Sequence, residues 1–304
     1  MDWKESFSDK LKQILKPDQF IFNAPMSEHT TFKIGGKADV LIFPSTTDEV
    51  VSVLKLINES DIPLTILGNG SNVLVRDNGI RGAVVKFNGK FAYMNRDGNK
   101  IKVGAGAKLK DISIFAAENG LAGMEFAVGI PGSIGGAIFM NAGAYGGEMK
   151  NIVSRVRAVS KSGKIDEFNL EQLHLSYRHS IFQTNGYAIC EVELQLENGN
   201  ISEIKEHMDD FTQRRESKQP LEYPSAGSTF KRPEGYFAGT LIDKTGLKGL
   251  RVGDAMVSEK HAGFVVNAGN ATAADVLNLI DEVKRRVYEV HGVMLSPEVR
   301  IIGE

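Results

Sequence analysis

The stretch Gly129-Ile130-Pro131-Gly132-Ser133-Ile134-Gly135-Gly136 decides how this sequence is interpreted. It lies inside a 28-residue window, 120–147, that contains nine glycines. Glycine allows a close approach to the backbone that any Cβ would block, and Pro131 stiffens the chain before the glycines. Ordinary tight turns rarely need so many glycines so close together. The window therefore favours a backbone surface that lies against a ligand, with a set of ordinary turns as the alternative.

A second glycine-rich segment, Gly68-Asn69-Gly70-Ser71-Asn72, follows a predicted strand at 64–67. Such a turn can aim successive backbone N–H groups and hydroxyls at phosphate oxygens, although an ordinary turn remains the alternative. The usual nucleotide motifs are missing. No G-x-x-x-x-G-K-[ST] occurs, and Gly104-Ala105-Gly106 is followed by Leu109 where a Rossmann fingerprint needs glycine. Any dinucleotide must bind by another route.

Composition excludes several classes of protein. The 304 residues include 36 Lys and Arg and 38 Asp and Glu, so the net charge of −2 gives no electrostatic case for nucleic acid or an anionic membrane. The most apolar stretch, 121–140, holds six Gly or Pro residues and one Glu, which is a poor membrane span. The single cysteine, Cys190, excludes a disulfide framework, and the six histidines lack metal-ligand spacing. We expect a cytoplasmic protein that binds no metal, membrane or nucleic acid. The sequence gives no indication of its oligomeric state.

Hydrophobic periodicity predicts an α+β fold, because strands outnumber helices and alternate with only some of them. A capping box is expected at Thr46–Glu49. The predicted helices span 3–16, 50–57, 108–119, 202–217 and 273–290, and the predicted strands span 39–43, 64–67, 83–87, 101–103, 153–159, 187–196 and 293–302. The expected domains are an N-terminal helix, 1–20, a domain at 21–198 divided near residue 90, and a domain at 199–304.

Polar residues outside the glycine segments are ambiguous on their own. Ser228 lies in a proline-flanked loop, 225–231, that does not form a G-x-S-x-G elbow, so a Ser-His-Asp hydrolase is a poor interpretation. A surface loop remains the alternative. For Arg178 the alternative is a surface salt bridge, and for Glu298 it is a solvated strand residue.

Taken together, seven segments in sequence order resemble the UDP-N-acetylenolpyruvoylglucosamine reductases, the flavoenzymes of bacterial cell-wall precursor synthesis. They are Thr31-Phe32-Lys33-Ile34-Gly35-Gly36, Gly68-Asn69-Gly70-Ser71-Asn72, Gly129-Ile130-Pro131-Gly132-Ser133-Ile134-Gly135-Gly136, Asn141-Ala142-Gly143-Ala144-Tyr145-Gly146, Tyr177-Arg178, Ala226-Gly227-Ser228-Thr229-Phe230-Lys231 and Pro297-Glu298-Val299-Arg300. They span nearly the whole chain, and such an ordered set is far more specific than any one of them.

The resemblance implies an FAD-binding domain of two subdomains, of the vanillyl-alcohol-oxidase or PCMH type, and a C-terminal α+β substrate-binding domain. It implies FAD and NADPH as cofactors, and a role in peptidoglycan synthesis and so in cell wall biogenesis, cell shape, cell division and the cell cycle. The implied cofactor-binding residues are Gly68, Asn69, Gly70, Ser71, Asn72, Pro131, Gly132, Ser133, Gly135, Gly136, Asn141, Ala142, Gly143 and Arg300.

The resemblance also implies a reaction in which a hydride reaches C3 of an enolpyruvyl ether and negative charge spreads from C2 into the carboxylate. Arg178 matches the carboxylate-facing arginine, and its planar fork suits that group. Ser228 matches the proton donor to C2. Glu298 matches a second stabiliser and is expected to be protonated when it donates. Tyr177 and Lys218 are implied as substrate-binding residues, with a solvated surface lysine as the alternative for Lys218.

The chain departs from many of these relatives in two places. Arg232 stands where many have Asn, and only 50 residues separate Arg178 from Ser228. The short interval resembles the type II subfamily, which lacks an inserted element that closes over the substrate. The residue that covers the substrate in this chain is therefore not assigned. A flavin-dependent oxidase of the same fold is the alternative enzyme, weakened by the lack of an obvious flavin-linking His or Cys. A nucleotide-binding module without activity is the third hypothesis.

Overall fold

The computed structural model describes residues 3–304, which form two compact units. Unit 1 consists of residues up to 22, 40–69 and 82–213, and unit 2 consists of 23–39, 70–81 and 214–304. The chain therefore passes between the units several times. Strands β1 (Phe20–Pro25), β2 (Lys37–Ile42) and β5 (Ile80–Lys86) each contain one of these passages.

The remaining elements are as follows. The helices are α1 (Trp3–Ile14), α2 (Thr47–Glu59), α3 (Leu109–Glu118), α4 (Ile134–Met140), α5 (Phe182–Asn185), α6 (Ile201–Lys218), α7 (Ala238–Lys244) and α8 (Ala273–His291). The other strands are β3 (Leu64–Leu67), β4 (Val73–Val75), β6 (Met94–Asp97), β7 (Lys100–Gly104), β8 (Leu121–Ala122), β9 (Gly143–Ala144), β10 (Gly147–Glu148), β11 (Val153–Val159), β12 (Ile165–Asn169), β13 (Ala188–Gln195), β14 (Glu197–Asn198), β15 (Arg251–Val252), β16 (Ala255–Val257), β17 (Val265–Asn267) and β18 (Arg300–Ile302).

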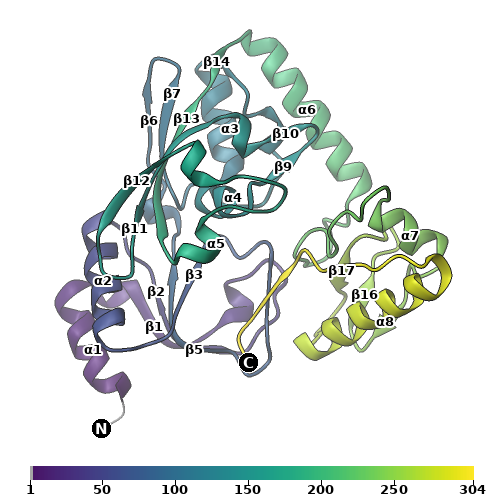
Figure 1. Cartoon of the computed structure of the whole chain (residues 1–304), viewed down its shortest axis with the longest axis horizontal. Helices are drawn as coiled ribbons and strands as arrows, with labels where there is room; N and C mark the ends of the chain where they lie inside the picture. The colour runs from purple at the N-terminus through teal and green to yellow at the C-terminus, as the bar shows by residue number, and fades with distance from the viewer. Residues whose placement is uncertain (1–2) are drawn as a thin grey trace. The chain divides into compact units, whose positions relative to one another are not determined.

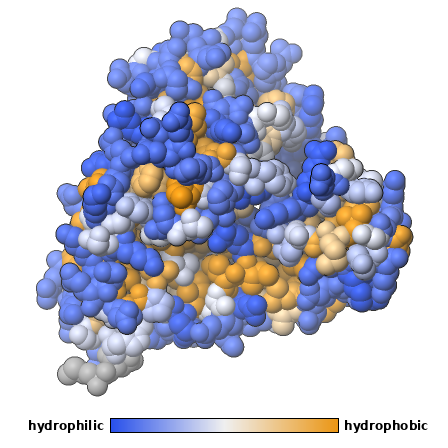
Figure 2. All heavy atoms as spheres, viewed as in Figure 1, coloured by the Kyte–Doolittle hydropathy of each residue, from blue (hydrophilic) through white to orange (hydrophobic). Residues whose placement is uncertain are grey.

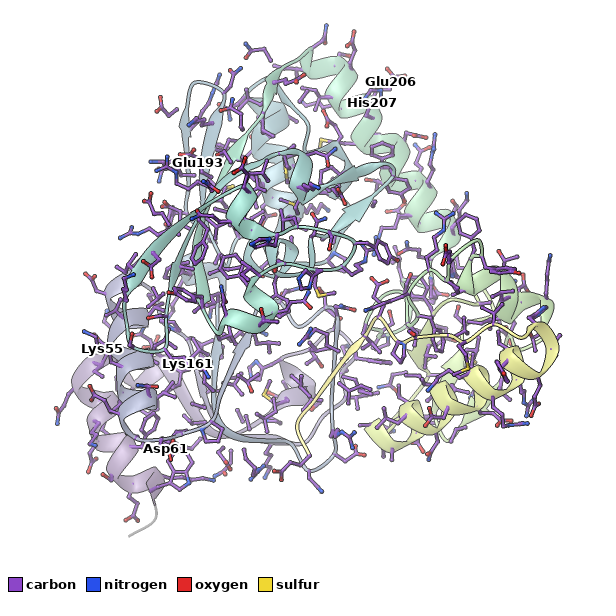
Figure 3. The ribbon with its side chains drawn as sticks, in the orientation of Figure 1. Lys55, Asp61, Lys161, Glu193, Glu206 and His207 are labelled. Atoms are coloured by element: carbon purple, nitrogen blue, oxygen red, sulfur yellow. The ribbon has the colours of Figure 1, made fainter. Side chains whose placement is uncertain are left out.

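Unit 1 is built on an antiparallel sheet of order β12-β11-β13-β7-β6, with α1 and α2 lying side by side at a second sheet (Figure 1). In that second sheet β3 runs parallel to β5, with Leu67 opposite Lys86. One hydrophobic core unites the unit, from Phe7 to Leu196. The carboxylate of Glu193, labelled in Figure 3, accepts from Lys100 and Ser154 of neighbouring strands, so this buried charge on β13 is paired.

Unit 2 contains the small sheet β15-β16-β17, which packs against α8, and α8 packs against α7. Strand β18 pairs in parallel with β4, and this joins residues 300–302 to residues 73–75. The hydrophobic core of unit 2 includes Phe32, Leu74 and Val283. The predicted boundary near residue 198 falls just before α6, whereas the compact units divide within that helix. The assignment of an FAD domain and a substrate domain to those sequence ranges stays a prediction.

Most predicted elements are present, with ends shifted by one to three residues. Residues 1 and 2 of the predicted N-terminal helix lie outside the described residues. The capping box at Thr46 is only half formed, because Thr46 Oγ1 accepts from Glu49 N–H while the Glu49 carboxylate accepts from Ser45 and Gln19 instead.

The strand predicted at 293–302 is wrong for its first part, since only Arg300–Ile302 forms a strand. Pro297 has no N–H to donate to a ladder, and it takes part only in an isolated bridge with Phe230. Within residues 3–304, no helix is both long and apolar enough to cross a membrane. On the face drawn in Figure 2, hydrophilic residues predominate and hydrophobic ones gather in separate areas.

Candidate functional site

Within unit 1, the start of one glycine-rich segment, Gly68 and Asn69, meets the other segment at the end of β3. The side-chain amide of Asn69 donates to the carbonyl oxygen of Pro131 at 2.6 Å. A Cβ added at Gly68 would lie 2.5 Å from the Ser133 hydroxyl oxygen. Segments more than sixty residues apart in the sequence therefore form one surface, as expected if both contact the same ligand.

The hydroxyl of Ser133 is buried and has no hydrogen-bond partner among residues 3–304. Ser133 precedes α4, yet its side chain does not cap that helix. The next two backbone N–H groups are already used, because Ile134 donates to Ala107 and Gly135 donates to Ala105. A buried hydroxyl without a partner costs about 1–3 kcal/mol, so the site is suited to a ligand that supplies a polar atom. The residues present thus fit a phosphate- or hydroxyl-bearing cofactor such as FAD.

The two glycines that open α4 serve different purposes. A Cβ at Gly135 would lie 3.0 Å from the Ala105 Cβ, so this glycine is needed for packing inside the protein. A Cβ at Gly136 would meet only the Ser133 hydroxyl, at 3.6 Å. Gly136 therefore borders open space, where a ligand has room to approach the backbone.

Asn141 ends α4 in the left-handed conformation, with φ of 42°, and it is fully buried. Its amide donates to the Glu148 carboxylate at 3.0 Å and to Ser176 O at 3.1 Å, and its Oδ1 accepts from Lys150 N–H at 2.9 Å. The side chain thus joins the β9–β10 hairpin to the turn at 176–179. Its polar atoms are occupied by the protein, and the predicted cofactor contacts of 141–143 stay a prediction.

Arg178 lies in that turn, with φ of 54°. Backbone hydrogen bonds in both directions between Ser176 and His179 close the turn, and Gln183 donates to Arg178 O at 2.9 Å. A bulky residue at positive φ is strained, and such strain persists only where the surroundings impose it. The guanidinium carbon lies 5.0 Å from the ring centre of the exposed Tyr177. The turn thus presents both predicted residues together.

In unit 2, the structure brings Ser228 and Glu298 close together. Thr229 lies between two segments, donating to Gly263 O at 2.9 Å while its own carbonyl accepts from Glu298 N–H at 2.8 Å. The Thr229 hydroxyl accepts from Val265 N–H at 2.8 Å, which pins the strand-like segment. Ser228, one residue earlier, is exposed. The buried threonine therefore fixes the segment on which the exposed serine is presented.

The predicted cofactor residues Asn72 and Arg300 also meet in unit 2. The side-chain amide of Asn72 donates to Glu298 O at 3.3 Å, and Arg300 N–H donates to Asn72 O at 3.0 Å. Thr31 was missed as a site residue by the sequence reasoning. Its hydroxyl donates to Ser225 O at 2.7 Å and its N–H donates to Gly70 O at 3.1 Å. Its place at the start of the first quoted segment was the signal that pointed to it.

Not all predicted residues belong to one unit. Those in unit 1 are Gly68, Asn69, Pro131, Gly132, Ser133, Gly135, Gly136, Asn141, Ala142, Gly143, Tyr177 and Arg178, and those in unit 2 are Gly70, Ser71, Asn72, Lys218, Ser228, Glu298 and Arg300. Lys218 ends α6 with an exposed side chain. Ser228 and Glu298 thus lie close together in unit 2, and Arg178 belongs to unit 1.

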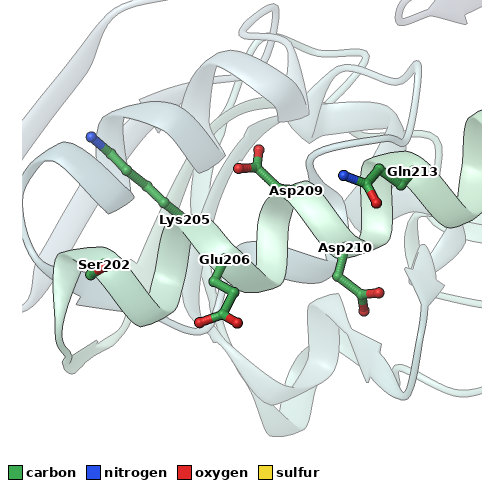
Figure 4. Close-up of a pocket in the computed structure, with 6 residues that line it drawn as sticks. All are labelled: Ser202, Lys205, Glu206, Asp209, Asp210 and Gln213. Atoms are coloured by element: carbon green, nitrogen blue, oxygen red, sulfur yellow. The ribbon is translucent and has the colours of Figure 1, made fainter.

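One surface depression contains none of the predicted site residues. A depression along α6 is lined by Ser202, Lys205, Glu206, Asp209, Asp210 and Gln213, all from that single helix (Figure 4). In the part of the chain that the structure describes, no three His, Cys, Asp or Glu residues gather in a way that could hold a metal ion.

Comparison with known proteins places these observations in a family. Residues 38–169 match the model of an FAD binding domain, and residues 219–302 match that of the UDP-N-acetylenolpyruvoylglucosamine reductase C-terminal domain. The UDP-N-acetylenolpyruvoylglucosamine reductase of Clostridium perfringens (strain SM101 / Type A) is 52% identical over 297 residues, covering 98% of this chain and 97% of that protein. The Clostridium kluyveri (strain NBRC 12016) protein of the same name is 51% identical over 300 residues, covering 99% and 98%.

A solved structure agrees. The crystal structure of UDP-N-acetylenolpyruvylglucosamine reductase from Thermus caldophilus has a TM-score of 0.80 and 37% identity, and it covers 94% of this chain and 98% of that one. The predicted α+β fold, with an FAD-binding domain and a C-terminal reductase domain, is confirmed. Across nearly its full length, this chain belongs to the UDP-N-acetylenolpyruvoylglucosamine reductase family.

Proposed function

We propose that this protein reduces the enolpyruvyl ether of UDP-N-acetylglucosamine to UDP-N-acetylmuramate, with NADPH as the reductant and FAD as the cofactor. The names of its relatives and the match to an FAD binding domain support this reaction. The observation that carries it within the structure is the buried, unpartnered hydroxyl of Ser133 beside Gly68.

FAD, when bound, supplies the carrier that takes a hydride from NADPH and delivers it to the substrate. The chain's part is to hold that group with backbone from the two glycine segments. Asn69 fixes the relation between the segments through Pro131, and the Ser133 hydroxyl provides a polar contact. Arg300 and Asn72 are proposed to contact the cofactor from unit 2.

Arg178 is proposed to bind the carboxylate of the enolpyruvyl group. Its planar fork matches two carboxylate oxygens. As hydride arrives at C3, negative charge grows on C2 and the carboxylate. A guanidinium carried on the closed backbone turn at 176–179 is suited to stabilise that charge. Tyr177 and Lys218 are proposed to bind the substrate.

Ser228 is proposed to donate a proton to C2. A hydroxyl is a weak acid, but the carbanion that it meets is strongly basic, so the transfer is favourable. The hydrogen bonds of Thr229 hold the adjacent backbone, so the serine needs little reorganisation when it donates.

Glu298 is proposed to stabilise the charge that develops on the substrate carboxylate. It does so in its protonated form, because a second negative charge would repel the developing one. The carbonyl and N–H of Glu298 are bonded to Asn72 and Thr229, which fixes the backbone at this residue.

We further propose that the protein acts in the cytoplasm and that its product enters peptidoglycan assembly, so that cell shape and cell division depend on it. Cys190 supports the compartment, because it is buried and forms no disulfide, as is usual in a reducing environment.

A spectrum of the purified protein tests the proposal. We expect flavin absorbance that bleaches when NADPH is added without oxygen and returns when the enolpyruvyl sugar nucleotide is added. Return of the absorbance with air but not with the sugar nucleotide would instead support the oxidase, which the names of the relatives do not favour. A colourless protein that takes up no FAD would contradict both enzymes.

A further inference from the structure

His261 lies in a closed turn of unit 2 that begins directly after β16. The Ser258 hydroxyl accepts from His261 N–H at 3.2 Å, and His261 O accepts from Phe264 N–H at 3.0 Å. Ser258 N–H in turn donates to Phe264 O at 2.9 Å. The buried Phe264 ring meets the imidazole edge to face, with the ring centres 4.9 Å apart. These contacts hold the half-buried imidazole in one place.

The imidazole accepts a backbone hydrogen bond that only its neutral form can accept. Gly263 N–H donates to His261 Nδ1 at 3.1 Å. A lone pair on Nδ1 requires the ring proton to be on Nε2, and a doubly protonated ring has no acceptor left. Glycine at 263 leaves room for the ring, because a Cβ there would lie 3.0 Å from His261 Cε1 and 3.2 Å from Nδ1. The ring and the backbone of Gly263 are therefore closely fitted.

Gly263 connects the imidazole to the segment that carries Ser228. Its N–H donates to His261, and its carbonyl oxygen accepts from Thr229 N–H at 2.9 Å. That second N–H belongs to the peptide that joins Ser228 to Thr229. The Thr229 hydroxyl, which accepts from Val265 N–H at 2.8 Å, adds another bond between the same two segments. A chain of two hydrogen bonds therefore runs from the His261 ring to the backbone of Ser228.

The surroundings of the ring favour its neutral form. Burial lowers the pKa of His261, and the positive charge of Lys248 acts in the same direction. Lys248 is paired with Asp243 of α7 at 3.1 Å. The same helix approaches the imidazole with uncharged Gly239, where a Cβ would lie 3.4 Å from Cε1, and the turn's own Glu259-Lys260 is exposed. The form that accepts from the backbone is thus the one that this environment stabilises.

We propose that the neutral His261 ring is a positioning residue for proton donation by Ser228. The inference rests on the proposed function. When Nδ1 is protonated, two N–H groups face each other, and Gly263 loses the acceptor that holds it against the Ser228 segment. The serine hydroxyl is then less often within hydrogen-bond reach of C2, and a proton donor acts only within that reach. Because the folded pKa is lowered, this positioning is present above that pKa and is lost as the pH falls through it.

The pH dependence of the two half-reactions tests the inference in the FAD-containing protein. Stopped-flow absorbance follows flavin reduction by NADPH and, separately, oxidation of prereduced flavin by saturating enolpyruvyl sugar nucleotide. His261→Asn can place its side-chain oxygen where Nδ1 lies, and it does not titrate. From about pH 7.5 to about pH 5, the second half-reaction should slow about 2- to 10-fold more in the unchanged protein than in His261→Asn, the effect of one lost hydrogen bond. Flavin reduction should show no such difference.

His261→Ala removes the acceptor at every pH. At about pH 7.5 its second half-reaction should be about 2- to 10-fold slower than that of the unchanged protein. The KM for the sugar nucleotide should stay within about twofold, because the position of the serine has changed and ground-state binding has not. His291→Asn is the matched control, since His291 is another half-buried histidine of unit 2, has its Nε2 3.1 Å from the Thr245 hydroxyl oxygen, and has no proposed role.

The outcomes separate this inference from the proposed function. Equal pH profiles in the unchanged protein and His261→Asn would overturn the inference, even if His261→Ala failed to fold. A higher KM without a slower second half-reaction would also overturn it, since the imidazole would then bind the substrate itself. The same flattened profile in His291→Asn would do so as well. If the sugar nucleotide did not oxidise the prereduced, unchanged protein, the proposed function would be contradicted, and the inference with it.

Discussion

At the scale of single residues, the Ser133 hydroxyl has opposite consequences for folding and for binding. Buried without a partner, it lowers the stability of the protein that lacks cofactor. The same unsatisfied group favours any ligand that supplies its missing hydrogen bond. Alanine would fill the position without this cost in stability, which is the reason for proposing that Ser133 binds the cofactor.

Ser133→Ala should therefore shift the two properties in opposite directions. We expect the free energy of unfolding of the cofactor-free protein, measured by urea titration, to rise by about 1–3 kcal/mol. The reason is that the buried polar group is gone and no side-chain cap is lost. FAD binding should weaken, which fluorescence titration of the cofactor-free variant would measure. FAD binding that is equal or tighter would show that the hydroxyl does not contact the cofactor.

The role proposed for Ser228 can be isolated by comparing the two half-reactions. In Ser228→Ala, flavin reduction by NADPH should proceed normally, while the step that consumes the enolpyruvyl substrate slows by about 100-fold or more because its proton donor is missing. Stopped-flow absorbance follows both steps. Ser225→Ala is the control, since this serine lies in the same segment without a proposed part in proton transfer. Equal slowing of both half-reactions in Ser228→Ala would rule out the assignment.

At the scale of elements, the sequence is informative where hydrophobic periodicity is strong and poor where an element depends on distant partners. Strands Leu64–Leu67 and Val153–Val159 are found where apolar runs predict them. Helix α7 was missed because it has only seven residues and begins at a phenylalanine instead of a capping residue. The strand β18 lies within the predicted strand 293–302, but no local pattern encodes its pairing with the distant β4.

The site shows the same division. The glycine segments were found because close backbone approach demands glycine, a requirement visible in the sequence itself. The contact of Asn69 with Pro131, and the tie from Asn141 to the Arg178 turn, arise from tertiary folding and leave no trace in spacing. The Thr31 hydroxyl was overlooked for the same reason, since its partner Ser225 lies 194 residues away.

The loop after β3 offers a test at this scale. Gly68→Ala would place a methyl carbon 2.5 Å from the Ser133 hydroxyl oxygen, so one of the two glycine segments must shift. We expect less FAD per chain after purification, measured by absorbance, with a small change in the unfolding midpoint. Gly89→Ala is the matched control, because a Cβ there meets nothing within 4 Å. Full FAD content in Gly68→Ala would contradict the role assigned to this approach of the two segments.

At the scale of the whole molecule, stability should depend on pH through His261 in unit 2. Burial lowers the pKa of this histidine below its ordinary value of 6.5. Its Nδ1 accepts a hydrogen bond from Gly263 N–H at 3.1 Å, an arrangement that needs the neutral ring. As the pH falls through the unfolded value, the unfolded chain takes up a proton that the folded chain resists. Stability is therefore fully present above that value and is lost below it.

Replacing His261 with Gln should reduce this dependence. Urea midpoints of the unchanged protein should fall between about pH 7.5 and about pH 5, and those of His261→Gln should fall by less. His207→Gln, a change at an exposed helix position in unit 1, serves as the control. The same fall in His261→Gln as in the unchanged protein would show that other groups set the acid sensitivity.

The parallel pairing of β4 with β18 has a consequence for synthesis of the protein in the cell. Residues 73–75 are made well before their strand partner, residues 300–302. Unit 2 therefore cannot form this pairing until residues 300–302 have been made, whereas the strands of the sheet β12-β11-β13-β7-β6 have all been made by residue 195. Until then the nascent chain carries an unpaired strand at residues 73–75, whose open edge is exposed to wrong pairing.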